Sequence, residues 1–135
     1  SSSIRAGQLG LPMTLAILGG NPLAFGRVIS LYRQAAAQAG HDLSKMKVAI
    51  NSHGFIARSN EEAIEKFFPP TQAVMNKIGR ERGWPPYTKE SFLQANALDG
   101  AIYAGDPETI ANKIILFIFI DNIYLVFNVS FIVLF

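Results

Sequence analysis

A cluster of polar side chains lies near the end of one predicted strand. These side chains could transfer a proton or form a hydrogen bond with an oxygen of a ligand. In the stretch 47–57, KVAINSHGFIA, strand alternation places Asn51 and His53 on one face and Ser52 on the other. Buried polar groups need hydrogen-bond partners, so these three residues are our internal candidates for a ligand site. His53 could donate a proton or a hydrogen bond to a ligand oxygen. The alternative is a hydrogen-bonded histidine of the core.

A second candidate group is the hydroxyl cluster Ser1, Ser2 and Ser3, which precedes a short helical stretch over residues 4–9. The first N–H groups of a helix are unpaired and carry positive partial charge, which suits an anion. The serines could therefore cradle a phosphate, and plain N-capping by serine explains the same pattern. Arg5, one turn into the helix, could also face the phosphate, but we favour a solvated charge.

A third group lies near the Trp84-Pro85-Pro86 sequence, which opens an irregular excursion over residues 84–100. Such a length exceeds an ordinary connection in a compact domain and is typical of functional loops. Arg80, Arg82, Trp84 and Tyr87 could close over an acidic ligand. A surface excursion anchored by Trp84 is the alternative.

Other kinds of chemistry lack support in the sequence. There are no cysteines and only two histidines, too few for a metal site. The neighbours His41 and Asp42 follow a helix end and are interpreted as structural. Nucleotide-binding glycine motifs and the GxSxG elbow are absent. With 12 basic and 10 acidic residues and no basic run, nucleic-acid binding is not expected. Without cysteines or a signal peptide, we expect a cytoplasmic location.

Strands and helices alternate along the chain. The apolar run 11–18 lies between Gly10 and Gly19-Gly20 and predicts a strand buried on both faces. Asn21-Pro22 then opens a helix over 22–39, which ends at Gly40. The apolar stripe expected on this helix comprises Val28, Leu31, Tyr32, Ala35, Ala36 and Ala39.

The second half continues this alternation. A capping box over 59–62 opens a helix that we expect to be interrupted at Pro69-Pro70, with a second piece over 71–82. The apolar run 101–104 precedes a turn and a helix start over 105–109. This order predicts an α/β fold with parallel strands.

Three stretches together resemble bacterial luciferase-like flavin monooxygenases: SSSIRAGQLGLPMTLAILGG at the N-terminus, LYRQAAAQAGHD at 31–42 and GDPETIANKI at 105–114. The resemblance covers roughly residues 1–114. It implies the C-terminal part of a (β/α)8 TIM barrel, roughly strands 6–8 with their helices. Residues 1–135 would form one partial-barrel domain cut from a longer chain.

The resemblance also implies a cofactor site. The family's later phosphate-binding hydroxyl falls on Ser2, so Ser1, Ser2 and Ser3 would hold the phosphate of reduced FMN. Ile17 matches a position against the flavin ring, although a plain core isoleucine explains it equally well. His53 would be catalytic, and the substrate side would include Asn51, Ser52, Arg80, Arg82 and Trp84. F420 is the less favoured cofactor, and no metal is expected.

The implied activity is oxidation of an unknown small organic substrate with reduced FMN and O₂. A flavin reductase would supply the reduced FMN, and the protein would form a homodimer. One alternative is a non-catalytic, flavin-binding half-barrel that dimerises.

The tail over 114–135 departs from the family because it is almost wholly apolar. It could be an unusual terminal sequence with a final strand over 122–128, a pair of buried strands, or a tail anchor in a membrane. Asp121, Asn122 and Asn128 argue against a transmembrane helix.

Overall fold

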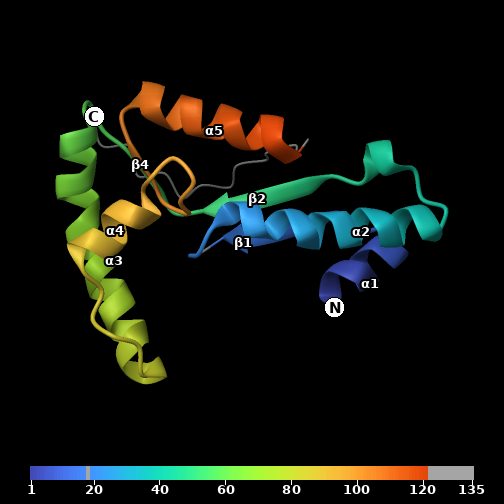
Figure 1. Cartoon of the computed structure of the whole chain (residues 1–135), viewed down its shortest axis with the longest axis horizontal. Helices are drawn as coiled ribbons and strands as arrows, with labels where there is room; N and C mark the ends of the chain where they lie inside the picture. The colour runs from blue at the N-terminus through green and yellow to red at the C-terminus, as the bar shows by residue number, and fades with distance from the viewer. Residues whose placement is uncertain (18, 122–135) are drawn as a thin grey trace.

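The computed structural model describes residues 1–17 and 19–121, with side chains as far as Leu116 (Figure 1). Short parallel strands alternate with helices, as the sequence predicts. The elements are α1 (Ser2–Gln8), β1 (Met13–Ile17), the 3₁₀ turn η1 (Pro22–Phe25), α2 (Gly26–Gln38), the 3₁₀ turn η2 (Leu43–Lys45), β2 (Val48–Ser52), β3 (Gly54–Ile56), α3 (Asn60–Arg82), α4 (Lys89–Ala95), β4 (Tyr103–Gly105) and α5 (Pro107–Asp121).

The strands form two parallel pairs, β1–β2 and β3–β4. The single strand predicted over 47–57 is therefore wrong, because it divides at His53. The backbone oxygen of His53 accepts a hydrogen bond of 2.9 Å from the amide of Tyr103, so the chain beyond it pairs with β4. The first strand is confirmed over Met13–Ile17, and Leu18 lies outside the described residues.

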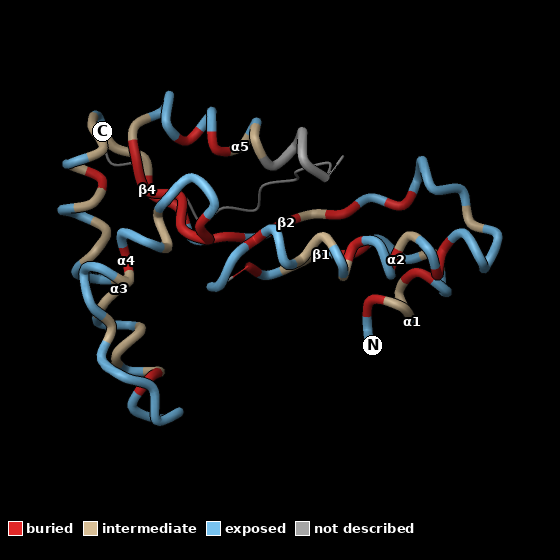
Figure 2. The backbone as a smooth tube through the Cα atoms, viewed as in Figure 1, coloured by how far each residue is buried: buried red, intermediate tan, exposed pale blue. Residues whose placement is uncertain are grey.

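Side chains alternate across the β1–β2 pair, as predicted for β2. The prediction that the first strand is buried on both faces is wrong, because Thr14 and Ala16 are exposed. Met13, Ile17, Val48 and Ile50 point to one side and pack against the helix layer, with Ile29, Tyr32 and Ala36 of α2 in the same core. The opposite side carries the exposed Thr14, Ala16 and Asn51 and the half-buried Ala49. These four small or polar residues form what we call the inner face of the pair. Figure 2 shows the buried positions along β2.

The predicted stripe of α2 is partly wrong. Tyr32, Ala35 and Ala36 are buried as expected, but Leu31 and Ala39 are exposed, and Ile29 takes the place of Val28 in the core. The reason is that the row through Ile29, Tyr32 and Ala36 shares one core with the buried side chains of β1 and β2. The hydroxyl of Tyr32 donates a hydrogen bond of 2.7 Å to the backbone oxygen of Leu11, and burial raises its pKa.

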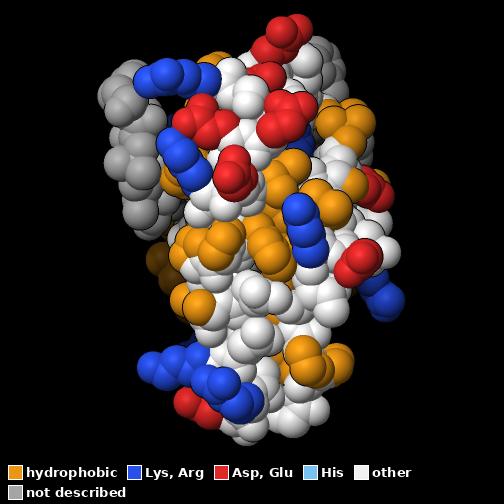
Figure 3. Space-filling view, turned by 90° about the vertical axis from the view of Figure 1, so that its left-hand side faces the viewer, with side chains coloured by type: hydrophobic (Ala, Val, Ile, Leu, Met, Phe, Trp, Pro, Cys, Tyr) orange, Lys and Arg blue, Asp and Glu red, His pale blue; other side chains and the backbone are white. Residues whose placement is uncertain are grey.

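The predicted interruption at Pro69-Pro70 is also wrong, since α3 is continuous from Asn60 to Arg82. Each proline removes one intrahelical hydrogen bond. The carbonyls left without those bonds belong to Glu65 and Lys66, which are exposed and can pair with water. The N-terminal cap is confirmed, because Ser59 Oγ accepts from the amide of Glu62 at 3.2 Å. Hydrophobic and charged side chains both appear on the α3 side of the molecule (Figure 3).

The excursion over 84–100 is more regular than predicted, because α4 forms within it. Phe92 of α4 is fully buried, and its ring lies 5.5 Å from that of Phe68 and 6.2 Å from that of Phe67. Asn96 follows α4 and pairs with Ala104 of β4 through two hydrogen bonds of 2.8 Å, one to each backbone polar group. The side chain of Asn96 thus pairs with β4 as a neighbouring strand would.

The tail begins as a helix. Asp106 caps α5 as predicted, with Oδ1 accepting from the amide of Thr109 at 2.8 Å, and this hydrogen bond lowers the pKa of Asp106. Because α5 runs to Asp121, the interpretation of 114–121 as a buried strand is wrong. The possible final strand over 122–128 lies outside the described residues. Within the described residues, no helix combines the length and apolar character needed to cross a membrane.

Candidate functional site

Four of the predicted site residues lie at the ends of β1 and β2. The register pairs Ile17 with Ser52, and Ser52 Oγ donates a hydrogen bond of 3.4 Å to the backbone oxygen of Ile17. Asn51 is exposed on the inner face, and His53 follows at the point where the chain leaves β1. The carboxyl ends of parallel strands form the ligand-binding edge of α/β folds. Asn51 and His53 therefore lie at this edge, and their contact with a ligand stays a prediction.

Ile17 and Ser52 have a different orientation. The side chain of Ile17 is 1% exposed and packs into the core with α2, on the side of the sheet opposite Asn51. Ser52 is 6% exposed, and its hydroxyl is already used by Ile17. In the described structure both residues hold the two strands together. Contact of Ile17 with a flavin ring stays a prediction.

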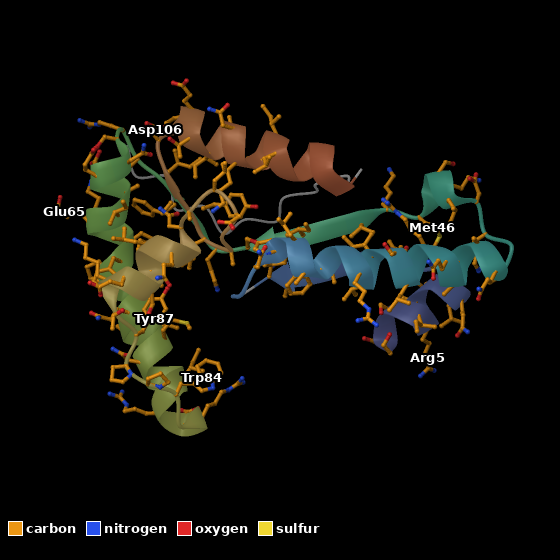
Figure 4. All side chains as sticks on the ribbon, viewed as in Figure 1. Arg5, Met46, Glu65, Trp84, Tyr87 and Asp106 are labelled. Atoms are coloured by element: carbon orange, nitrogen blue, oxygen red, sulfur yellow. The ribbon has the colours of Figure 1, made fainter. Side chains whose placement is uncertain are left out.

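The serines lie at the start of α1. Ser1 occupies the N-cap position but makes no capping hydrogen bond through its side chain. Its hydroxyl instead lies 2.8 Å from that of Ser3, which is buried, whereas Ser2 is exposed. Simple N-capping by Ser1 therefore does not account for the cluster. Arg5 is exposed, as expected for a solvated charge (Figure 4).

A cavity of about 620 Å³ adjoins these serines. Its polar lining residues are the three serines, Thr14 and Arg27, which lies at the beginning of α2. Its apolar wall is formed by Met13, Leu15, Val28 and Leu31 among others. Hydroxyl donors and a guanidinium beside an apolar surface suit a ligand that has a phosphate and a ring system. We call this space the serine cavity.

Sequence reasoning missed Arg27. Arg27 is not part of the predicted apolar stripe of this helix, and no role was predicted for it. The one available signal was its position just after Gly26, at the start of a helix that follows a strand. The partnership with Ser1–Ser3 depends on the packing of α1 against α2, which no local pattern reveals.

The remaining predicted residues form a separate cluster at the C-terminal end of α3. The guanidinium carbon of Arg82 lies 5.3 Å from the centre of the Trp84 ring, which is 48% exposed. Arg80 and Trp84 line a hollow of about 250 Å³. The labelled Arg5 and Trp84 lie far apart in Figure 4, so this cluster and the serine cavity do not share one site.

Tyr87 belongs to the packing around α3 and α4. Its amide donates to Asn76 Oδ1 at 2.8 Å, and its backbone oxygen accepts from Gln72 at 2.8 Å. Burial raises the pKa of its phenol. Among the residues that the structure describes, no group of three or more His, Asp or Glu side chains could hold a metal ion.

The structure is an α/β fold with a partly polar cavity beside its strands. A family model described as luciferase-like monooxygenase matches residues 2–118. The chain belongs to that family. Among curated proteins, none gives a significant match.

Solved structures agree on the fold. The oxygenating constituent of 3,6-diketocamphane monooxygenase from Pseudomonas putida, in complex with FMN, is 19% identical, with a TM-score of 0.60 over 91% of this chain. The coenzyme F420-dependent tetrahydromethanopterin reductase from Methanopyrus kandleri is 20% identical, with a TM-score of 0.61 over 95%. An F420-dependent secondary alcohol dehydrogenase, in complex with an F420–acetone adduct, is 20% identical, with a TM-score of 0.62 over 96%.

The chain spans only part of these relatives, namely 36%, 42% and 39% of their lengths. It is an α/β fragment that corresponds to part of a luciferase-like TIM barrel. Its relatives include proteins with FMN and proteins that depend on F420.

Proposed function

We propose that the chain is the C-terminal part of a flavin-dependent oxidoreductase that uses reduced FMN and O₂ on a small organic substrate. The observation that carries this proposal is the serine cavity, which Ser1–Ser3 and Arg27 line together with apolar residues. Family membership and the FMN in one related structure support it. Residues outside this chain would complete the barrel.

The residues of the serine cavity fit the phosphate end of a flavin. Their hydroxyls can donate hydrogen bonds to phosphate oxygens, and the Arg27 guanidinium can neutralise part of the phosphate charge. The apolar wall would exclude water from one side of the ligand. A bound flavin would supply the redox chemistry, while Ser1–Ser3 and Arg27 would fix its position. F420 also carries a phosphate and is the second cofactor to test.

The experiment compares FMN with riboflavin, which lacks the phosphate. We expect FMN to bind the chain about tenfold more tightly than riboflavin, as measured by flavin fluorescence, because charge-assisted hydrogen bonds to the phosphate contribute roughly 1.5–3 kcal/mol. Arg27→Met and Ser2→Ala should each reduce this preference several-fold. The affinity for riboflavin should stay the same.

Lys45→Met is the matched control, since Lys45 is an exposed cation of η2 that does not line the serine cavity. Equal affinities for FMN and riboflavin in the unmodified chain would refute the phosphate site. Absence of binding by FMN and F420 alike would refute the flavin assignment for this chain.

The second candidate is a flavin-binding half-barrel without turnover. The observation that favours it is the exposed inner face of β1–β2, which a complete barrel would enclose. Such a chain would bind FMN and form a homodimer that covers this face. Consumption of O₂ with reduced FMN by the purified chain would favour the enzyme. The flavin reductase partner, the homodimer and the cytoplasmic location stay predictions.

A further inference from the structure

A second concave site lies between the end of β2 and the middle of α3. It has a volume of about 180 Å³ and is lined by His53, Phe67, Pro70, Thr71, Val74 and Met75. The residues from α3 follow one side of the helix across its two prolines. We call this site the His53 groove. It shares no lining residue with the serine cavity.

The groove is apolar except for one imidazole. No charged residue lines it, and the Thr71 hydroxyl is already committed to the backbone oxygen of Phe67 at 2.7 Å. The side chain of His53 is exposed and has no hydrogen-bond partner among the described residues. A charged ligand would lose hydration here without gaining a counter-charge, so the groove suits a neutral molecule.

The volume limits the size of that molecule. An apolar cavity of about 150 Å³ is large enough to bind benzene. A groove of about 180 Å³ therefore fits one ring or a short branched chain. The imidazole can form a hydrogen bond with one oxygen at the edge of such a molecule.

We infer that the His53 groove binds a neutral, ring-sized organic molecule whose carbonyl or hydroxyl oxygen hydrogen-bonds to His53. Apolar contact with Phe67, Val74 and Met75 supplies most of the affinity, and His53 selects molecules with an oxygen. Binding to the groove does not require a flavin. The assignment of this molecule as the substrate rests on the proposed function.

Methionine methyl groups provide the readout, because the chain has three methionines in distinct places. Met75 lines the groove, whereas Met13 and Met46 are buried in the core against α2. Titration of the ¹³C-methyl-labelled chain with cyclohexanone is expected to shift the NMR signal of Met75 alone. Benzene, which has no oxygen, should shift the same signal with a weaker affinity.

Two variants separate the roles of the groove residues. His53→Ala should reduce the affinity for cyclohexanone about fivefold, because a neutral hydrogen bond contributes about 1 kcal/mol. Its affinity for benzene should change by less than twofold. Val74→Asp should reduce the affinity for both probes more than tenfold, because it places a carboxylate on an apolar wall of the groove. Val74 is 57% exposed, so this change should not unfold the helix. Leu93→Asp, at an exposed position of α4 outside the groove, is the control and should change neither affinity.

Shifts of Met13 or Met46 equal to that of Met75 would overturn the groove as the binding site, as would the absence of any shift. An equal loss of affinity for both probes in His53→Ala would contradict the inferred hydrogen bond between His53 and the oxygen of the ligand. Failure of the FMN experiment with an intact response of Met75 would remove the proposed function and leave the groove.

Discussion

Replacing Gly7 by alanine is expected to lower the free energy of unfolding by about 2 kcal/mol. Gly7 is buried at the crossing of α1 and α2. A methyl group there would overlap the backbone oxygen of Tyr32 and would lie 3.1 Å from both the amide nitrogen of Ala36 and the Cβ of Ala35. The overlap is with backbone atoms, so a side-chain rotation cannot relieve it. The two helices would have to separate.

Two opposing effects determine whether Gly7→Ala raises or lowers the free energy of unfolding. Alanine in place of glycine stabilises a helix interior by about 0.5–1 kcal/mol, because it restricts the unfolded chain. Overpacking of a tight interior costs about 1–3 kcal/mol. At Gly7 the cost of overpacking should therefore exceed the helix stabilisation, so Gly7→Ala should lower the free energy of unfolding.

Gly79→Ala is the matched control, the same change in α3. The nearest atoms to its methyl group would be Trp84 Cβ at 3.4 Å and two backbone oxygens at 3.9 and 4.0 Å, which are ordinary contacts. Here the higher helix propensity of alanine should dominate, and the free energy of unfolding should rise by about 0.5 kcal/mol. Urea denaturation followed by circular dichroism measures both changes. A stabilising effect of Gly7→Ala would contradict the close packing of α1 on α2.

Lys113 should make the stability of the chain rise with pH. Its side chain is 2% exposed, and Nζ donates hydrogen bonds of 2.6 Å to the backbone oxygen of Ala97 and 2.5 Å to that of Ile102. Nζ also lies 4.5 Å from the centre of the Tyr103 ring. Desolvation lowers the pKa of Lys113 from 10.5 to about 8, although the charge of Asp99 acts in the opposite direction.

The sign follows from proton binding. Between pH 8 and 10.5 the unfolded chain keeps the proton of Lys113, while the folded chain has lost it. The unfolded state therefore binds more protons, and the free energy of unfolding increases with pH. From pH 7 to 9.5 the expected gain is about 1–2 kcal/mol. Above pH 10 the raised pKa of Tyr103 has the opposite effect, because ionisation then favours the unfolded state.

Lys113→Met isolates this contribution. The variant should lose the rise between pH 7 and 9.5, because methionine fills a similar volume without a titratable group. Lys77→Met, at an exposed position of α3, should keep the rise of the unmodified chain. The measurement is urea denaturation at several pH values. A rise that persists in Lys113→Met would show that another group causes it.

The comparisons match most of the chain, and the sequence had already suggested the same family. The three stretches that carry the resemblance could be recognised because each combines regularly spaced apolar residues with turn residues. The site was less predictable. Asn51 and His53 do stand together at a strand end, but Ile17 and Ser52 belong to the core, and Arg27 was missed.

By itself the sequence determined the local features of this protein. Ser59 and Asp106 cap their helices, Gly40 and Gly83 follow helix ends with φ of 80° and 70°, and β2 alternates between its two faces. Each of these depends on a side chain and a backbone only a few residues away. Such interactions persist in almost any fold that contains the segment.

Only the tertiary structure decided the rest. The strand divides at His53 because Tyr103 pairs with its backbone, and α4 forms where Phe92 can be buried against α3. Lys113 is buried because two distant carbonyls and a ring surround its ammonium group. Arg27 lines the same cavity as the serines because α1 packs closely on α2 at Gly7. These outcomes are contacts between residues far apart in the chain, and their free energy exists only once the chain has folded.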